Sequence, residues 1–385
     1  MARSPFPQPV YGGQISVSAT GERRTGSAKQ PPFHRSRGRL GRCPQISADR
    51  YDGACHPQRR GMRRRKALIR LSRPGDILGM VPYLVGFHPK ESVVAVMLRS
   101  ARVVLTIRVD LPPPSEAGDV AAHIVRLARQ HRAQDLVLIA YSVDPQARAV
   151  LTEVATEVAD CELQDVLFVD GQRWWSLVCT GGCCPPDGRP YDPSSSAVAA
   201  QAVYAGLAAR PDRGALEADV RGPAEEECAA LSRLAQKEST HVEGLKLTAR
   251  CDLMRTTIVA SLAQQNPLDD STCARLALLA RDVPVRDVAW AMISGKDAEQ
   301  HRRVWARVVA RTVAPLEAAP LCLLGFCAWI CGDGAMMNCC IQRVTNVDPE
   351  YSFGQLLAKI SQQALPPHLW DEVGAADRKQ RSIVR

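Results

Sequence analysis

Polar side chains that could orient a small molecule alternate along one predicted strand. Between residues 102 and 110, apolar residues occupy the odd positions, whereas Thr106, Arg108 and Asp110 stand at even positions. Because successive side chains of a strand point to opposite faces, these three share one face. Asp76 and His88 precede them in the same structural unit. A guanidinium beside carboxylates could hold a small-molecule ligand at the edge of a sheet.

A structural interpretation of the same residues competes with the ligand site. Arg108 and Asp110 could form an ion pair that caps loops at the sheet edge, and such ion-pair networks resemble active sites. His88 stands between Phe87 and Pro89 and is most simply a turn residue. We favour the structural interpretation because it is the more common one for such sets, and the ligand site stays open as the alternative.

A second candidate site is the thiol cluster of Cys179, Cys183 and Cys184 in the run CTGGCCPPDG. Three thiolates brought together by a tight turn could bind zinc or form a redox pair. The spacing is not that of a zinc ribbon, no His is adjacent, and a disulfide between the neighbouring Cys183 and Cys184 would be strained. We therefore favour structural packing here and expect no bound metal and no cofactor.

Other motifs of catalytic chemistry are absent from the sequence. It contains no phosphate-binding loop, no G-x-S-x-G and no H-E-x-x-H. Gly332-Asp333-Gly334 has no third glycine and no preceding strand, so we expect close helix packing there rather than a dinucleotide site. Trp174 and Trp175 point to opposite faces of their strand, so we expect one in the core and the other half exposed.

The elements that must position these groups begin with a strand–helix–strand unit. Residues 68–71 are a short apolar run, Pro74 and Asp76 favour the first turn of a helix, and Gly86 favours its end. Further strands are predicted at 92–98, 102–110, 135–143, 163–169 and 173–179, and further helices at 115–132 and 146–159. The order β-α-β-β-α-β-α-β-β predicts a mixed β-sheet with covering helices.

Everything beyond residue 196 is predicted to be helical. The turn-rich run 180–196 marks the exit from the sheet. Amphipathic segments follow at 197–209, 223–236, 238–264, 271–281, 284–293, 297–313, 320–344 (with a break at Gly332) and 352–364. Short loops between them favour an antiparallel helical array. The predicted fold class is therefore α/β followed by all-α.

Domain boundaries follow from these changes of pattern. We expect a disordered basic extension at 1–65, a mixed α/β domain at 66–184, a linker at 185–196, a helical domain at 197–370 and a polar tail at 371–385. The extension holds fourteen of the 49 basic residues and three of the 40 acidic ones, so the remainder carries a net charge of −2 although the whole chain carries +9. The body therefore has no electrostatic footprint for nucleic acid.

The basic extension has two interpretations. It could be an arm that touches nucleic acid or an acidic surface. Translation could instead begin at Met62, and we favour this second interpretation because the extension lacks interleaved aromatic residues and any folding signal.

Neither a membrane nor a secretory route is indicated. The N-terminus has no apolar core of a signal peptide. The longest apolar stretch, residues 318–332, is shorter than the ~20 residues that a bilayer span needs. Most of the fourteen cysteines fall inside apolar helical patterns, which is typical of reduced, buried thiols. We expect a cytoplasmic protein.

Several stretches, in order along the chain, resemble one known family. They are SRPGDILGMVPYLVGFHPKESVVAVML with LTIRVDLP, then RWWSLVCTGGCCPPDG, then AWICGDGA with VDPEYS and ALPPHLW. From Leu68 to Trp370 the chain is similar to the actinobacterial "domain of unknown function 4192" family. The resemblance implies a cytoplasmic actinobacterial protein of mixed α/β and then helical build. It brings no established activity, cofactor or catalytic residue.

Two classes of function fit the sequence. One is a binding or scaffold protein for an unknown protein partner, because helical arrays commonly serve as interaction surfaces. The other is an enzyme or ligand-binding protein acting on a small molecule near Asp76, Arg108 and Asp110. We favour the binding or scaffold protein, since no nucleophile–base set is recognisable, and whether the protein is an enzyme stays open. No membrane partner is expected, and no nucleic acid except through the extension.

Overall fold

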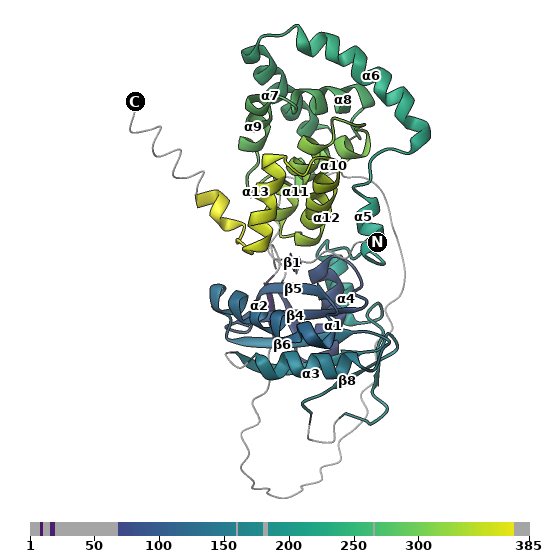
Figure 1. The fold of residues 1–385 in the computed structure, drawn as a ribbon, viewed down its shortest axis with the longest axis vertical. Helices are drawn as coiled ribbons and strands as arrows, with labels where there is room; N and C mark the ends of the chain where they lie inside the picture. Colours follow the sequence, from purple (N-terminus) through teal and green to yellow (C-terminus); the bar gives the residue numbers. More distant parts are fainter. Residues whose placement is uncertain are drawn as a thin grey trace, which may run out of the picture.

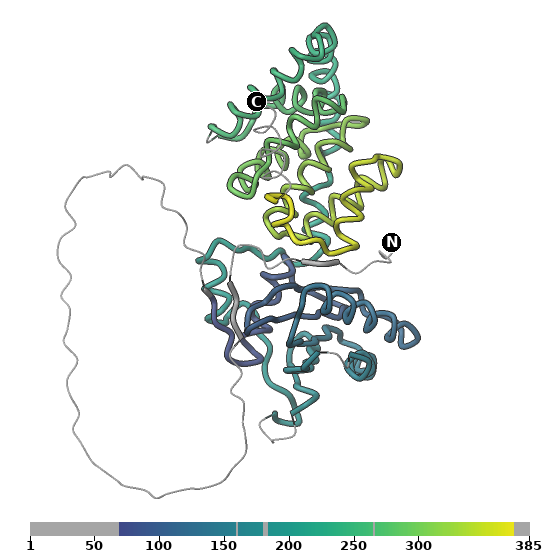
Figure 2. The backbone as a smooth tube through the Cα atoms, turned by 90° about the vertical axis from the view of Figure 1, so that its left-hand side faces the viewer, coloured from purple at the N-terminus to yellow at the C-terminus, as the bar shows by residue number. Residues whose placement is uncertain are grey.

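The computed structural model describes residues 8–10, 16–19, 68–158, 161–179, 184–264 and 266–372. Within these ranges an α/β part lies at one end of the long axis and a helical part at the other, as two perpendicular views show (Figure 1 and Figure 2). The predicted fold class, a mixed sheet with covering helices followed by an all-α part, is confirmed.

One mixed sheet runs through the α/β part. Its strands are β1 (Gln8–Val10), β2 (Ser16–Ala19), β3 (Leu68–Leu71), β4 (Ser92–Arg99), β5 (Arg102–Asp110), β6 (Asp135–Tyr141), β7 (Glu162–Val169), β8 (Arg173–Ser176) and β9 (Arg189–Pro190). Their order across the sheet is β3-β2-β5-β4-β6-β7-β8-β9, and β1 pairs with β5. β4 is antiparallel to β5 and β6, whereas β6 is parallel to β7. From β3 to β8 the elements follow the predicted order.

Helix α1 (Pro74–Val85) begins and ends where its sequence predicts. The carboxylate of Asp76 accepts hydrogen bonds from the backbone N–H groups of Ser72 (2.9 Å) and Arg73 (3.1 Å), which fixes the chain at the entry to the helix. Gly86 follows the last turn with a φ of 88°, a left-handed conformation that costs glycine little. The apolar stripe of α1 packs on β3 and β5.

Helices cover both faces of the sheet. On one face α1 packs against α4 (Ala197–Tyr204); on the other, α2 (Ala117–Gln130), entered through the 3-10 turn η1 (Pro114–Glu116), packs against α3 (Ala147–Glu157). β3 runs parallel to β4, and β5, β6 and β7 run the opposite way. Right-handed crossovers therefore place α1 on the face opposite to α2 and α3. β4, covered on both faces, is buried except at Arg99, as predicted.

The helical part lies over the β5 edge of the sheet (Figure 1). Its helices are α5 (Arg213–Ala218), α6 (Glu225–Glu243), α7 (Leu247–Ala263), α8 (Asp270–Leu279), α9 (Val283–Ala291), α10 (Ala298–Ala310), α11 (Ala318–Cys331), α12 (Gly334–Val347) and α13 (Ser352–Gln362). From α10 to α13 each helix packs on the next. α11 is buried from Ala319 to Trp329, and Gly332, with a φ of 81°, separates it from α12 at the predicted break.

Two stretches of the N-terminal extension form strands. β1 runs antiparallel to β5, with Gln8 opposite Arg108 and Val10 opposite Thr106, and β2 pairs with both β3 and β5. These two strands fall within the stretch 1–65 that we expected to be disordered, and the domain boundaries stay predictions. Strands this short show no period in the sequence, and the partner of β1 lies about a hundred residues along the chain. Met62 and the tail beyond residue 372 lie outside the described ranges.

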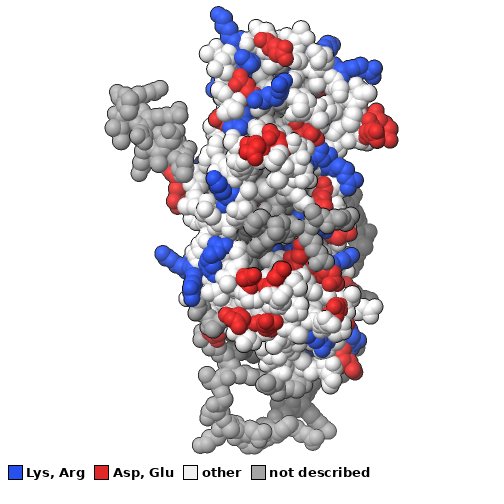
Figure 3. Space-filling view, viewed as in Figure 1, with Lys and Arg blue, Asp and Glu red and all other residues white. Residues whose placement is uncertain are grey.

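Two surface properties bear on the classes of partner. No helix within the described ranges has both the length and the apolar character required to cross a bilayer. On the face shown in Figure 3, both basic and acidic side chains occur over the α/β part and over the helical part. This mixture agrees with the small net charge of the chain outside the extension.

Candidate functional site

One face of β5 carries Thr106, Arg108 and Asp110. The side chain of Arg108 makes several contacts at this face. Arg108 is only 5% exposed. One terminal nitrogen of its guanidinium forms an ion pair with Asp110, the other donates to the carbonyl of Lys90 (3.3 Å), and the group lies 5.8 Å from the ring centre of Phe87. Arg108 therefore ties β5 to the loop before β4 and to the end of α1.

The charge of Arg108 is only partly compensated. Burial lowers the pKa of its guanidinium, Asp110 acts in the opposite direction, and the nearby Arg213 lowers the pKa further. Its Nε atom is buried and has no hydrogen-bond partner among the described residues. A buried donor without an acceptor is costly, so this end of the strand has an unused capacity to bind a polar or anionic group.

Ser92, which the sequence analysis did not single out, belongs to the same polar row. It stands opposite Asp110 on one side and Tyr141 on the other. Ser92 and Thr106 are both fully buried, and neither hydroxyl has a partner within the described ranges. The sequence offered one indication of Ser92, a serine at the start of an otherwise apolar strand. The sequence could not show that this serine pairs with Asp110 in the sheet.

The structure separates Asp76 from the other predicted site residues. Asp76 is in the first turn of α1, whereas His88 follows its last turn, and a helix of twelve residues is about 18 Å long. His88 follows Phe87, whose ring contacts Arg108, and the backbone N–H of His88 donates to the carbonyl of Arg210 (3.0 Å). Burial, and then the charge of Lys90, lower the pKa of the His88 imidazole. Asp76 is therefore a capping residue, and His88 a turn residue near Arg108.

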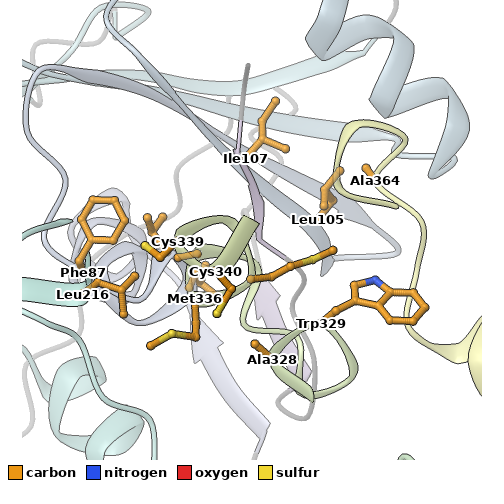
Figure 4. Close-up of a cluster of buried hydrophobic side chains, with 14 of the residues drawn as sticks. Phe87, Leu105, Ile107, Leu216, Ala328, Trp329, Met336, Cys339, Cys340 and Ala364 are labelled. Carbon is orange, nitrogen blue, oxygen red and sulfur yellow. The ribbon is translucent and has the colours of Figure 1, made fainter. Parts of the chain in front are cut away.

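The outer edge of β5 lies where the α/β part meets the helical part. Figure 4 shows Leu105 and Ile107 of β5 in one buried cluster with Trp329 of α11, Cys340 of α12 and Ala364 after α13. β1 lies in the same place, in contact with β5 and also with α12 and α13. The sheet edge and two helices thus enclose the position of this strand.

Hydrogen bonds also join the two parts beside this edge. At the end of α2, Nε2 of Gln130 donates to the carbonyl of Gln363 (2.6 Å), and Nε2 of His131 donates to the carbonyl of Ala364 (3.0 Å). Burial is the main cause that lowers the pKa of His131. These contacts hold α13 over the sheet, so the relative position of β5 and the helices is defined.

Two hollows in the described part of the chain are small. One, of about 60 Å³, is lined by residues that include Val344, Asp348 and Tyr351. Another lies between Thr312, Leu321 and Arg343 and has no measurable free volume. Ligand pockets usually measure about 300–1,000 Å³, and neither hollow contains Arg108 or Asp110.

Comparison with known proteins places the chain in a family. The family model "Domain of unknown function (DUF4192)" matches residues 74–368, which is most of the chain. The chain belongs to this family. No curated protein and no solved structure matches it. The DUF4192 domain starts with α1 and ends shortly after α13, so the edge of β5 lies inside the domain whereas β1 and β2 lie outside it.

The thiol cluster of the DUF4192 domain is described only in part. Cys179 ends one described range and Cys184 begins the next, and Cys183 lies outside them. Within the described ranges no three His, Cys, Asp or Glu side chains are placed to hold a metal ion. Because Cys183 is not among those residues, structural packing and the absence of a metal at this cluster both stay predictions.

The tandem tryptophans of the DUF4192 domain occupy the two predicted environments. Trp174 is 8% exposed and belongs to the core, and Trp175 is half buried. The indole N–H of Trp175 donates to the carbonyl of Pro186 (3.0 Å), and the guanidinium of Arg148 lies 4.3 Å from its ring centre. Trp175 therefore packs against α3 and the loop before β9.

The Gly332-Asp333-Gly334 run joins two helices. Asp333 precedes α12 and its carboxylate accepts a hydrogen bond from the N–H of Met336 (3.0 Å). Gly86, at the end of α1, lies so close that an added Cβ would be 3.8 Å from that carboxylate. The run therefore caps a helix where the two parts of the molecule meet. The close helix packing expected at this run stays a prediction, and the structure shows such packing at Gly325, where an added Cβ would be 3.0 Å from the Cβ of Cys340.

Proposed function

We propose that the protein is a binding protein that takes an extended segment of a partner protein as an added strand on the outer edge of β5. The observation that carries the proposal is the position of β1. Gln8, Pro9 and Val10 pair antiparallel with Arg108, Ile107 and Thr106, on the edge that β4 does not use. Addition of a strand to a sheet edge is a common mode of peptide recognition, in which main-chain hydrogen bonds supply the affinity.

Pro9 shows which backbone groups of β5 face the added strand. Pro9 has no N–H, so the pairs that exchange hydrogen bonds are Gln8 with Arg108 and Val10 with Thr106. The N–H and C=O groups of Thr106 and Arg108 therefore point away from β4. Prolines also stand at positions 5 and 7 of the sequence. A segment with prolines at alternate positions can pair on one side only, which suits an added edge strand.

The surroundings of β1 favour recognition of a strand over recognition of a small molecule. β5 lies on one side of β1, and α12 and α13 also contact it. β2 continues along β5, with Ser18 opposite Arg102, and fills the space between β5 and β3. A strand entering here is enclosed by elements from both parts of the molecule. Recognition of this kind needs no large cavity.

The alternative, an enzyme or ligand-binding protein acting on a small molecule near Asp76, Arg108 and Asp110, has less support. Asp76 caps α1 at the end far from Arg108. Both terminal nitrogens of Arg108 already have partners in Asp110 and Lys90. We therefore do not propose that function.

The test uses the full-length chain with its own strand disabled. Substituting Gln8→Pro and Val10→Pro removes the two N–H groups through which β1 pairs, and we call this chain the open-edge variant. A fluorescent peptide of residues 5–20 is titrated into the open-edge variant and into the unchanged chain, with anisotropy as the readout. We expect binding to the open-edge variant and at least about tenfold weaker binding to the unchanged chain, because a tethered strand competes at high effective concentration.

Two modified peptides test whether the main chain is recognised. N-methylation at Val10 removes a paired donor and should weaken binding by about tenfold or more, whereas N-methylation at Tyr11, a residue that does not belong to β1, should be tolerated. Equal affinities of these two peptides would contradict the proposal. Absence of any binding to the open-edge variant, with its melting temperature unchanged, would also contradict it.

We also propose that the protein resides in the cytoplasm of an actinobacterium. Cytoplasmic residence is supported by the cysteines buried in the helical part, which fit a reducing compartment. An actinobacterial source is proposed from the resemblance of the sequence motifs alone. Fractionation of the host cells with an antibody against the chain would test the location.

A further inference from the structure

We infer that the strand accepted by β5 carries an acidic residue at the position opposite Arg108, and that Arg108 and Arg213 recognise it. The inference rests on the proposed function, because it names the chemistry of the strand that this edge takes. In the chain's own strand, Gln8 stands at this position.

Strand geometry directs the side chain at this position toward Arg108. Residues directly opposite each other in an antiparallel pair project to the same face, with Cβ atoms about 4.5–5.5 Å apart. On that face the side chain of Arg108 is only 7% exposed, and its Nε atom has no acceptor among the described residues. A carboxylate from the incoming strand supplies a charge-assisted hydrogen bond, which is shorter and stronger than a neutral one.

A second guanidinium lies on the side of the helical part. Nε of Arg213, the first residue of α5, donates to Glu217 (2.7 Å), and a terminal nitrogen donates to Gln342 of α12 (2.9 Å). These bonds hold Arg213 against α12, and α12 is a helix that contacts β1. The charge of Arg213 also lowers the pKa of Arg108. A second cation, from the helical part, therefore lies near the strand edge that carries Arg108.

The nearby carboxylates pair with the two arginines but leave one donor of Arg108 unused. Asp110 pairs with Arg108 and Glu217 pairs with Arg213, whereas Nε of Arg108 has no acceptor among the described residues. A carboxylate at the position of Gln8 accepts a hydrogen bond from this cationic donor more strongly than a neutral amide oxygen does. An acidic partner strand is therefore the stronger occupant of this edge, and the chain's own strand, with Gln8 at this position, is the weaker one.

The experiment compares peptides of residues 5–20 that differ by one charge, titrated into the full-length open-edge variant. They are the unchanged peptide, the Gln8→Glu peptide, and the Thr20→Glu peptide, which has the same added charge outside the paired strands. We expect Gln8→Glu to bind about tenfold more tightly at low salt, and Thr20→Glu to bind within about twofold of the unchanged peptide. The gain should shrink in 1 M NaCl.

A protein variant tests the role of the second arginine. Arg213→Gln in the open-edge variant keeps a polar side chain at a helix start where the arginine is 20% exposed, and a thermal melt checks that it folds. The advantage of the Gln8→Glu peptide should fall to about threefold or less, while the affinity of the unchanged peptide is retained. Equal affinity of the unchanged and Gln8→Glu peptides would overturn this inference and leave the proposed function standing. Failure of all three peptides to bind would overturn the proposed function itself.

Discussion

The guanidinium of Arg108 joins three segments of the chain. It reaches Asp110 on its own strand, the carbonyl of Lys90 before β4, and the ring of Phe87 after α1. Asp110 is about one-third exposed, so water stabilises its carboxylate even without Arg108. The cost of removing Arg108 therefore comes mainly from lost packing, a lost hydrogen bond and a cavity beside Thr106, whose hydroxyl already has no partner among the described residues.

We expect Arg108→Ala to lower the free energy of unfolding by about 2–3 kcal/mol, near the centre of the range for buried polar networks. Urea denaturation of the full-length variant measures this. Arg102→Ala is the matched control, because Arg102 is exposed on the same strand, and it should change stability by less than about 0.5 kcal/mol. Equal losses of unfolding free energy in the two variants would show that Arg108 stabilises the β5 edge no more than an exposed residue does.

The sequence pattern could place Thr106, Arg108 and Asp110 on one face, because the alternation of side chains along a strand depends only on neighbouring residues. It could not show which side chains from other segments meet that face. Ser92 lies in this row because of the register of β4, and Arg213 is positioned by the packing of α5 against α12. Both depend on tertiary contacts, and neither residue lies in a motif with its own chemistry.

At the scale of elements, α1 is the clearest case of local control. Pro74, Asp76 and Gly86 define its ends by backbone geometry and hydrogen bonds within a few residues. β1 and β2 are the opposite case, because each exists only through its partners on β5 and β3. Their bounds could not be predicted from composition, which for this basic, proline- and glycine-rich segment is typical of disorder. The long helices of the helical part were predictable from their period, but the short α5 was missed.

The capping role of Asp76 can be separated from any role in binding. Asp76→Ala should lower the free energy of unfolding by about 1 kcal/mol, since two backbone N–H groups lose their acceptor. The affinity of the open-edge variant for the peptide of residues 5–20 should not change. Asp119→Ala is the control, because Asp119 is in the first turn of α2 but makes no capping hydrogen bond, and it should cost only a few tenths of a kcal/mol. Loss of peptide binding in Asp76→Ala would restore Asp76 to the candidate site.

At the scale of the whole molecule, the two parts share one continuous hydrophobic core that passes through the β5 edge (Figure 4). Five cysteines are buried within the helical part: Cys273, Cys322, Cys327, Cys339 and Cys340. Burial raises the pKa of Cys273 and Cys339 to about 12, and raises the pKa values of the other three thiols as well. In the unfolded chain these thiols ionise near pH 8.5.

Stability should therefore fall as the solution becomes alkaline. The folded state keeps protons that the unfolded state loses, so stability from these thiols is complete below about pH 8.5 and decreases progressively toward pH 12. Urea unfolding under reducing conditions at pH 7.5 and 9.5 should show a loss of roughly 1 kcal/mol for each buried thiol. Cys339→Ala should reduce this loss by roughly 1 kcal/mol, the contribution of one buried thiol. Cys228→Ala, at a partly exposed position of α6, should leave the loss unchanged. A free energy of unfolding that is the same at both pH values would contradict the prediction.

The position of β2 between β3 and β5 has a consequence for the order of synthesis. Residues 16–19 leave the ribosome before either of their partners, and Ser18 precedes its partner Arg102 by 84 residues. At about 5–20 residues per second, that interval is roughly 4–17 s. A strand that is made early is thus completed only after β5 has been made. Every newly made chain passes through a period in which the edge of β5 is complete and its own N-terminal strand competes with any other strand within reach.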